Sequence, residues 1–188
     1  IYQVLDSLHK KYKAMADVGG SEIRYTSQNM KTALFGLDTE YIFLKASLAK
    51  EEIPFLLDTG AGGNLLTKEL ARKYNVKIMA DSLVMMGFGK GYAQIGIAEN
   101  FKMGNIEIKN MPFYVVDEIV PADIRKKMNF EINAILGIDF LKLVNTLEID
   151  VKEKTILFPS VTSQPEQKMN MMISNSALYV QIFMPTGE

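Results

Sequence analysis

The hydrophobic pattern changes along the chain, from a helical period at the N-terminus to a strand period after residue 36. Over the first 15 residues the large apolar side chains recur every three or four positions, which is the spacing of one helix face. Gly19 and Gly20 follow this stretch and end the predicted helix, as glycines at helix C-termini commonly do. The apolar face predicted in this way consists of Ile1, Leu5, Leu8, Tyr12 and Met15.

After residue 36, short runs of β-branched, aliphatic and aromatic residues are separated by turn residues, a pattern typical of β-hairpins. The expected hairpins cover residues 39–60, 82–99, 101–117 and 146–159. Short helices are expected at residues 67–75, with Thr67 as the N-cap, at 121–129, where Pro121 comes first, and just after Gly137. Residues 21–35 show no clear period. The predicted fold class is mostly β, with short helices and one N-terminal helix.

Composition narrows the classes of function. Apolar residues make up 48% of the 188-residue chain, which predicts a globular protein. The net charge of −1 gives no sign of a nucleic-acid or anionic-membrane partner, and no apolar run is long enough for a membrane span. The chain has no Cys and one His, which excludes thiol nucleophiles, disulfides and Cys/His zinc sites. Carboxylates are therefore the natural acid–base groups.

The most informative stretch is IPFLLDTGAGGNLLTKEL, residues 53–70, in which an apolar strand runs directly into Asp58. A carboxylate at the end of a buried strand is costly unless neighbouring groups satisfy it. Gly60 permits a tight turn and a close approach of the backbone, and the Thr59 hydroxyl can fix the loop through a hydrogen bond. We therefore expect Asp58 to be held rigidly, in a position suited to general acid–base chemistry.

Asp58-Thr59-Gly60-Ala61 resembles the D-[TS]-G-[AST] signature of aspartic peptidases in the pepsin and retroviral-protease clan, above all the retropepsin-like bacterial branch. Two further elements occur in the order that the family shows. One is the glycine-rich hairpin tip Gly87-Phe88-Gly89-Lys90-Gly91, and the other is Ile135-Leu136-Gly137 ahead of a short helix. The resemblance extends over roughly residues 36–160, where it implies a closed, barrel-like acid-protease lobe.

The resemblance also implies a role for each element. Asp58 would be the catalytic residue, and the three residues after it would support its loop. Gly87, Phe88, Gly89 and Gly91 would form a mobile flap that opens for the substrate and closes over it. Ile135, Leu136 and Gly137 would thread beneath the catalytic loop. Residues 1–35 would be a helical accessory segment.

The chemistry implied is hydrolysis of peptide bonds by an aspartic endopeptidase, in which two aspartates share a proton and activate water without a cofactor or metal. The chain holds one such motif. Glu40 replaces the glycine after Asp38-Thr39, and Asp139 is expected in the first turn of a helix, where the helix dipole favours it. The second aspartate is expected from a symmetric homodimer partner or from a second lobe. The expected substrate is a peptide or protein bound as an added strand.

Composition shifts again after Pro159. Residues 160–170 are polar and contain a proline, as linkers often do. ALYVQIFMPTGE, residues 177–188, is similar to EYIFLKASLAKEE, residues 40–52, in placing Tyr and aliphatic residues before a polar turn. We therefore expect residues 161–188 to be a linker and the first strand of a second lobe. The chain begins with Ile, as it would after removal of a signal peptide, so a periplasmic or secreted location is expected.

Two features depart from the family pattern. Ala61 stands where pepsin-like enzymes often carry a hydroxyl that favours the charged dyad, so we expect a mildly acidic pH optimum. Gly62 and Gly63 are expected to loosen the loop. These glycines and the single acid leave an alternative open, a catalytically inactive peptide-binding module on the same fold. His9 has no partner pattern and is interpreted as a residue of the helix surface.

Overall fold

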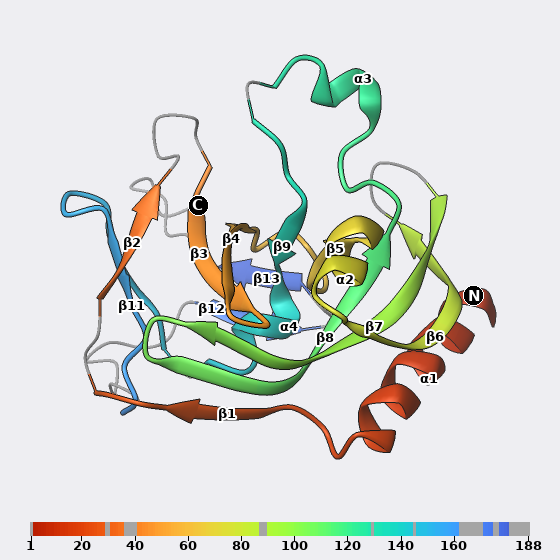
Figure 1. Cartoon of the computed structure of the whole chain (residues 1–188), viewed down its shortest axis with the longest axis horizontal. Helices are drawn as coiled ribbons and strands as arrows, with labels where there is room; N and C mark the ends of the chain where they lie inside the picture. Colours follow the sequence, from red (N-terminus) through yellow and green to blue (C-terminus); the bar gives the residue numbers. More distant parts are fainter. Residues whose placement is uncertain are drawn as a thin grey trace, which may run out of the picture.

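The computed structural model describes residues 2–28, 31–35, 41–86, 90–128, 130–144, 146–161, 171–174 and 177–180 (Figure 1). Helices and strands have the types that the hydrophobic pattern predicts, with strands predominating. The helices of these residues are α1 (Tyr2–Asp17), α2 (Lys68–Lys73), α3 (Ala122–Arg125) and α4 (Ile138–Leu141).

Six strands of the described chain close into a barrel. Their order around it is β3 (Phe43–Leu48), β4 (Glu51–Leu57), β9 (Ala134–Leu136), β5 (Leu65–Thr67), β8 (Ile106–Val116) and β7 (Lys90–Met103). The barrel closes because β3 pairs with β4 on one side and with β7 on the other. The pairs β4–β9 and β5–β8 are parallel, whereas β5–β9 and β7–β8 are antiparallel. The prediction of a mostly β, closed barrel-like fold is confirmed.

The other strands extend this barrel or stand apart from it. β6 (Lys77–Met86) forms a long hairpin with β7, and β1 (Glu22–Tyr25) pairs with β8. From β3 the sheet continues through β2 (Lys31–Phe35) and β11 (Thr155–Leu157) to β10 (Glu148–Asp150). β12 (Met171–Ser174) and β13 (Ala177–Val180) form a separate two-stranded antiparallel sheet.

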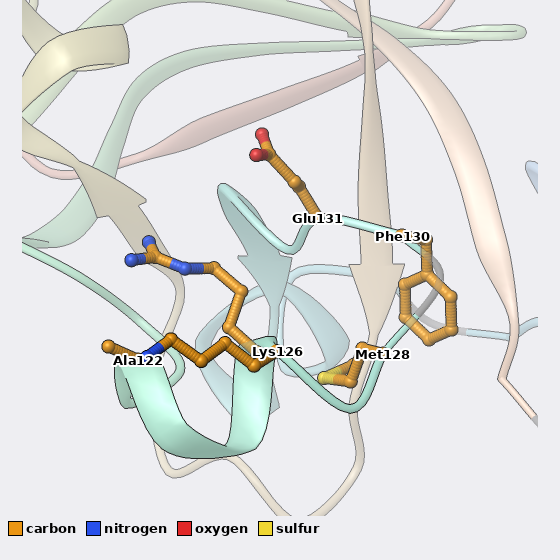
Figure 2. Close-up of a pocket in the computed structure, with 6 residues that line it drawn as sticks. Ala122, Lys126, Met128, Phe130 and Glu131 are labelled. Carbon is orange, nitrogen blue, oxygen red and sulfur yellow. The ribbon is translucent and has the colours of Figure 1, made fainter.

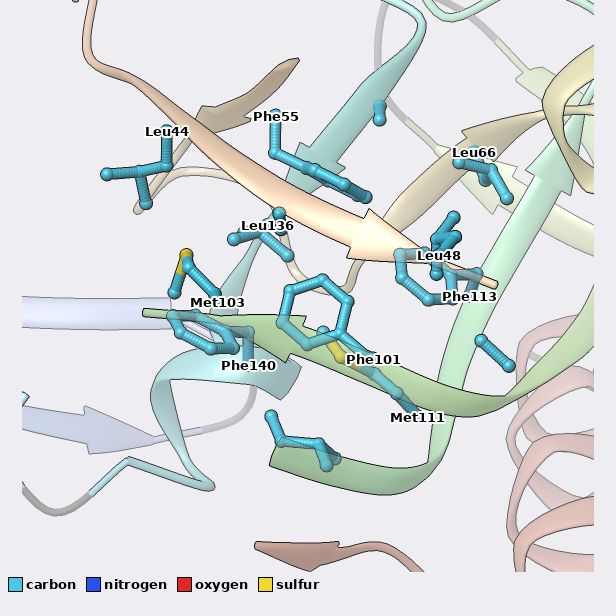
Figure 3. Close-up of a cluster of buried hydrophobic side chains, with 14 of the residues drawn as sticks. Leu44, Leu48, Phe55, Leu66, Phe101, Met103, Met111, Phe113, Leu136 and Phe140 are labelled. Atoms are coloured by element: carbon cyan, nitrogen blue, oxygen red, sulfur yellow. The ribbon is translucent and has the colours of Figure 1, made fainter. Parts of the chain in front are cut away.

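Aromatic rings from distant parts of the sequence fill the barrel (Figure 3). Phe55 of β4 packs edge-on against Phe101 of β7, with 5.6 Å between the ring centroids. Phe101 in turn lies 6.2 Å from the ring of Phe140 in α4. All three side chains are fully buried, and burial of each contributes roughly 1.5–3 kcal/mol. This packing fixes β4, the strand that leads to Asp58, against α4.

The four predicted hairpins are present, as β3–β4, β6–β7, β7–β8 and β10–β11. Thr67 caps α2 as predicted, because its hydroxyl accepts a hydrogen bond from the Leu70 N–H at 3.4 Å. The strands β1, β2, β5 and β12 were not predicted. β1 and β2 are short, and each is formed by pairing with strands that are distant or separate in sequence: β1 with β8, and β2 with β3 and β11.

The N-terminal helix forms and ends just before the predicted glycines, but the predicted apolar face is not, as a whole, the buried one. Leu5 and Tyr12 are 56% and 64% exposed, whereas Ser7 and Lys11 are buried. The helix is turned in this way because its polar side chains find partners on the barrel. Ser7 accepts a hydrogen bond from the Val84 N–H of β6 at 2.8 Å, and Lys11 forms an ion pair described below. His9 is exposed, as predicted.

The expected division into segments 1–35, 36–160 and 161–188 stays a prediction. The first segment contributes more than a helix, because it also supplies β1 and β2 to the main sheet. In the last segment, β13 begins at Ala177, where a strand was expected, and pairs with β12.

Candidate active site

Asp58 lies where two parallel strands end side by side. Leu56 and Leu57 of β4 pair with Ile135 and Leu136 of β9. One residue further on, the Asp58 N–H donates to the Leu136 carbonyl oxygen at 2.9 Å. The structure thus brings together the two sequence elements that stand more than seventy residues apart.

The loop that begins at Asp58 is a tight turn held partly by the carboxylate itself. The Gly60 N–H donates to Asp58 Oδ1 at 2.8 Å, and the Ala61 N–H donates to the Asp58 carbonyl oxygen at 3.2 Å. Asp58 is half-buried, whereas Thr59 and Gly60 are exposed at the tip of the turn. One carboxylate oxygen is therefore oriented by the backbone, which suits a group that must present its charge in a fixed direction.

At Gly137, just after β9, the backbone passes very close to the backbone of the loop that follows Asp58. A Cβ atom at this position would lie 2.4 Å from the Gly63 carbonyl oxygen and 2.6 Å from that of Ala61. The next residue, Ile138, donates its N–H to the same Ala61 oxygen at 2.9 Å. Only a residue without a side chain allows the two backbones to meet in this way.

Asn64 joins three elements around the loop, and sequence reasoning missed it. Its fully buried side-chain amide donates to the Pro112 carbonyl oxygen at 3.0 Å. Its Oδ1 accepts hydrogen bonds from the N–H groups of Gly137 and Phe140, at 3.0 and 3.2 Å. Its own carbonyl oxygen accepts the Tyr114 N–H at 2.8 Å. The available signal was a single amide residue between two glycines and a buried strand, in GGNLL.

The expectation that Gly63 loosens the loop is wrong. Gly63 is buried, and a Cβ atom there would lie 2.5 Å from the Tyr114 ring and 2.8 Å from Asp139 Oδ2. The absent side chain makes room for these two groups, so the glycine serves close packing. Gly62, by contrast, is exposed.

Asp139 lies in the first turn of α4, as predicted, but it also has a partner that the sequence did not reveal. Its Oδ2 atom is 2.5 Å from the Lys11 ammonium of α1, which in turn lies 5.0 Å from the centroid of the Tyr114 ring. Burial alone would lower the pKa of Lys11, but Asp139 and Tyr114 outweigh it and the pKa is raised. Burial raises the pKa of the Tyr114 hydroxyl, although Lys11 opposes that shift.

The hairpin expected to carry the flap is formed by β6 and β7, whose last pair is Met86 with Lys90. Gly87, Phe88 and Gly89 lie outside the described residues. Gly91 is exposed in β7, opposite Met85, and no atom of the described residues lies within 4 Å of the position of a Cβ. The flap role of these residues stays a prediction.

A pocket of about 390 Å³ lies beside the segment that leads into β9 (Figure 2). Its lining residues are Ala122, Arg125, Lys126, Met128, Phe130 and Glu131. Met128 and Phe130 pack on a buried cluster that includes Leu56 and Ile135, and Ala61 packs on the same cluster. The pocket and the Asp58 loop therefore border a common apolar cluster.

The described residues contain no group of three or more His, Asp or Glu side chains placed to hold a metal ion. Their helices include none that is long and apolar enough to cross a membrane.

The sequence profile described as "Aspartyl protease" matches residues 44–140. This match covers more than half of the chain and includes Asp58, Asn64 and Gly137. The chain therefore belongs to the aspartyl protease family. A search of the curated proteins finds no match.

Two solved structures are similar in fold. A retropepsin-like aspartic protease from Rickettsia conorii is 23% identical, with a TM-score of 0.46, and the match covers 73% of this chain and 92% of that one. The retroviral protease-like domain of Ddi1 from Leishmania major is 17% identical, with a TM-score of 0.43, and the match covers 73% and 98%.

Gly137→Ala should destabilise the protein by about 1–3 kcal/mol or more, because the methyl group would overlap two backbone carbonyls that cannot rotate away. Gly91→Ala is the matched control, since it adds the same methyl group where no described residue is in contact, and it should change stability by less than about 0.5 kcal/mol. Urea denaturation of both variants measures the difference. Equal stabilities would show that the crossing at Gly137 is not so tight.

Asn64→Ala should cost roughly 2 kcal/mol or more, since the Pro112 carbonyl and the Gly137 N–H each lose the amide as a partner, at about 1–3 kcal/mol each. The Phe140 N–H also loses the amide but keeps the Gly137 carbonyl oxygen at 3.1 Å. Asn133→Ala serves as the control, because the Asn133 amide bonds only the exposed Glu131 carboxylate among the described residues. Thermal unfolding of both variants checks the comparison. A small shift for Asn64→Ala would mean that water replaces the amide at this junction.

Proposed function

We propose that this chain supplies one catalytic aspartate, Asp58, to an aspartic endopeptidase. The observation that carries the proposal is the geometry of Asp58 at the end of β4. Its backbone N–H is bound to Leu136 and one carboxylate oxygen is bound to the Gly60 N–H. Membership of the aspartyl protease family supports the same chemistry.

In the proposed reaction Asp58 and a second aspartate hold one proton between them, because two adjacent carboxylates cannot both ionise. The charged carboxylate takes a proton from water as the water oxygen attacks the scissile carbonyl carbon. The protonated carboxyl gives its proton to the carbonyl oxygen, which forms a neutral tetrahedral diol. The carboxyl that holds the proton from water then gives it to the amide nitrogen, and the other, now charged, carboxylate takes a proton from a diol hydroxyl. The C–N bond breaks, which releases an amine and a carboxylic acid and leaves one proton on the pair. The enzyme forms no covalent intermediate and uses no cofactor.

The second aspartate has to come from outside the D-T-G motif of this chain, which occurs once. A second copy of the chain or a second lobe of the same protein can supply it. Thr59 and Gly60 are exposed at the tip of the loop, so this side of the site is open to such a partner.

The proposed substrate is an extended peptide that lies across the Asp58 loop and beneath the β6–β7 hairpin. We place one substrate side chain in the pocket of Figure 2, because its wall continues the apolar cluster beneath Ala61. Apolar contact there would come from Met128 and Phe130. Backbone hydrogen bonds along the peptide would supply affinity that does not depend on sequence.

Asp58→Asn should abolish hydrolysis, with a fall of at least about 100-fold in kcat, because an amide cannot take a proton from water. Binding of the same peptide should survive, since the shape of the site is unchanged. Asp117→Asn is the control, because Asp117 is a well-exposed acid paired only with Lys68 among the described residues. Cleavage of a peptide library followed by mass spectrometry provides the readout. Binding without cleavage in the unaltered protein would favour a peptide-binding module instead.

The source of the second aspartate is tested by mixing the unaltered protein with excess Asp58→Asn protein. If two copies build one site, mixed dimers form and the hydrolysis rate falls as the variant is added. If a covalently linked lobe supplies the acid, the rate is unaffected by the variant, and specific activity does not change on dilution. Excess Asp117→Asn protein should not inhibit in either case.

A further inference from the structure

The N-terminal helix is fixed to the barrel by polar contacts along its whole length. Near its start, the Ser7 hydroxyl accepts the Val84 N–H of β6. Beyond its end, the Asn110 side chain of β8 donates to the carbonyl oxygens of Val18 and Gly20, at 2.8 and 3.2 Å. Figure 1 shows α1 running beside β6, the strand that leads into the hairpin tip. The position of α1 is thus set by directed bonds as well as by the apolar contacts of Ala14, Met15 and Val18 with the barrel.

Lys11 is the most unusual of these contacts, because it is a lysine on the inner face of the helix. Its side chain is only 8% exposed, and that of Asp139 is 15% exposed. Removing an ion pair from water is costly, and apolar residues of similar size often stabilise a fold as well or better. Stability alone is therefore a weak explanation for this buried ion pair. A role in positioning the elements that the pair joins explains it better.

Both partners of Lys11 touch the Asp58 loop. Asp139 and Tyr114 are the side chains that crowd the Cβ position of Gly63. The backbone of Tyr114 is bound to Asn64, and the first residue of α4, Ile138, is bound to Ala61. Lys11 thus holds β8 and α4 together at the point where each of them supports the loop.

We propose that Lys11 is a positioning residue for the Asp58 loop, acting through Asp139 and Tyr114. Helix α1, which carries Lys11, is then required for full catalytic activity. The inference rests on the proposed peptidase function, whereas the contacts of Lys11 are present whether or not the protein is a peptidase. Lys11 touches neither the substrate nor the reacting atoms. Its effect is to keep two walls of the loop at a fixed separation.

Three variants test the proposal. Lys11→Met keeps the length of the side chain and removes its charge, whereas Lys11→Arg keeps the charge. Lys10→Met is the matched control, because Lys10 is on the same helix and pairs with Asp6 at the surface, at 2.9 Å. In the Lys11→Met protein, kcat should fall by about 10- to 100-fold with little change in KM, as expected for a small displacement of a catalytic group. Lys11→Arg should recover most of the activity, and Lys10→Met should lose none.

Amide hydrogen exchange gives a second readout that needs no catalysis. In Lys11→Met the amides of Asp58, Gly60 and Gly137 should exchange at least about tenfold faster. The Ile156 amide of the β10–β11 hairpin reports any global loss of stability and should change much less. Equal acceleration at all of these amides, or none, would overturn the proposal, as would an unchanged kcat.

Two further results are informative. If the unaltered protein cleaves no peptide, the peptidase proposal fails, but the exchange comparison still decides whether Lys11 positions the loop. If Lys11→Met does not fold, the double variant Lys11→Met with Asp139→Asn removes both charges and leaves no buried ion unpaired. A folded double variant with a slow kcat and fast loop exchange supports the proposal, and one with normal kcat and loop exchange overturns it.

Discussion

The contact between two stretches of backbone at Gly137 is the constraint on which the rest of this site depends. Carbonyl oxygens of Ala61 and Gly63 lie where a side chain would otherwise be. This close approach brings the Leu136 carbonyl to the Asp58 N–H and the Ile138 N–H to the Ala61 carbonyl. Asp58 is therefore held first by backbone bonds at the crossing of two chain segments, and the side chains around the loop support that crossing.

Where the strands separate to make this crossing, the regular pattern of sheet hydrogen bonds is interrupted, and buried polar groups need other partners. Asn64 meets that need, because one amide side chain satisfies groups from β8, from Gly137 and from α4. The loop is consequently tied by buried hydrogen bonds despite its glycines. Gly63 has no side chain, and the Tyr114 ring and the Asp139 carboxylate occupy the space that a side chain would take.

The N-terminal helix is bonded to the elements that surround this loop. An amphipathic helix normally turns its apolar stripe inward, yet here Leu5 and Tyr12 face outward while Ser7 and Lys11 are buried. Specific bonds to Val84 and Asp139 account for this orientation. The helix belongs to the same folded unit as the barrel and reaches the elements that surround Asp58.

The sequence by itself determined the hairpins, the short helices and the acid-bearing loop, because strand alternation, glycine turns and caps are local properties of a few neighbouring residues. It also indicated that Asp58 and Ile135-Leu136-Gly137 belong together, through a family motif. Only the tertiary structure decided the role of Asn64 and the pairing of Lys11 with Asp139, which are 128 residues apart. A polar residue on an inward face is stable only with a partner from another part of the fold, and no local sequence pattern identifies that partner.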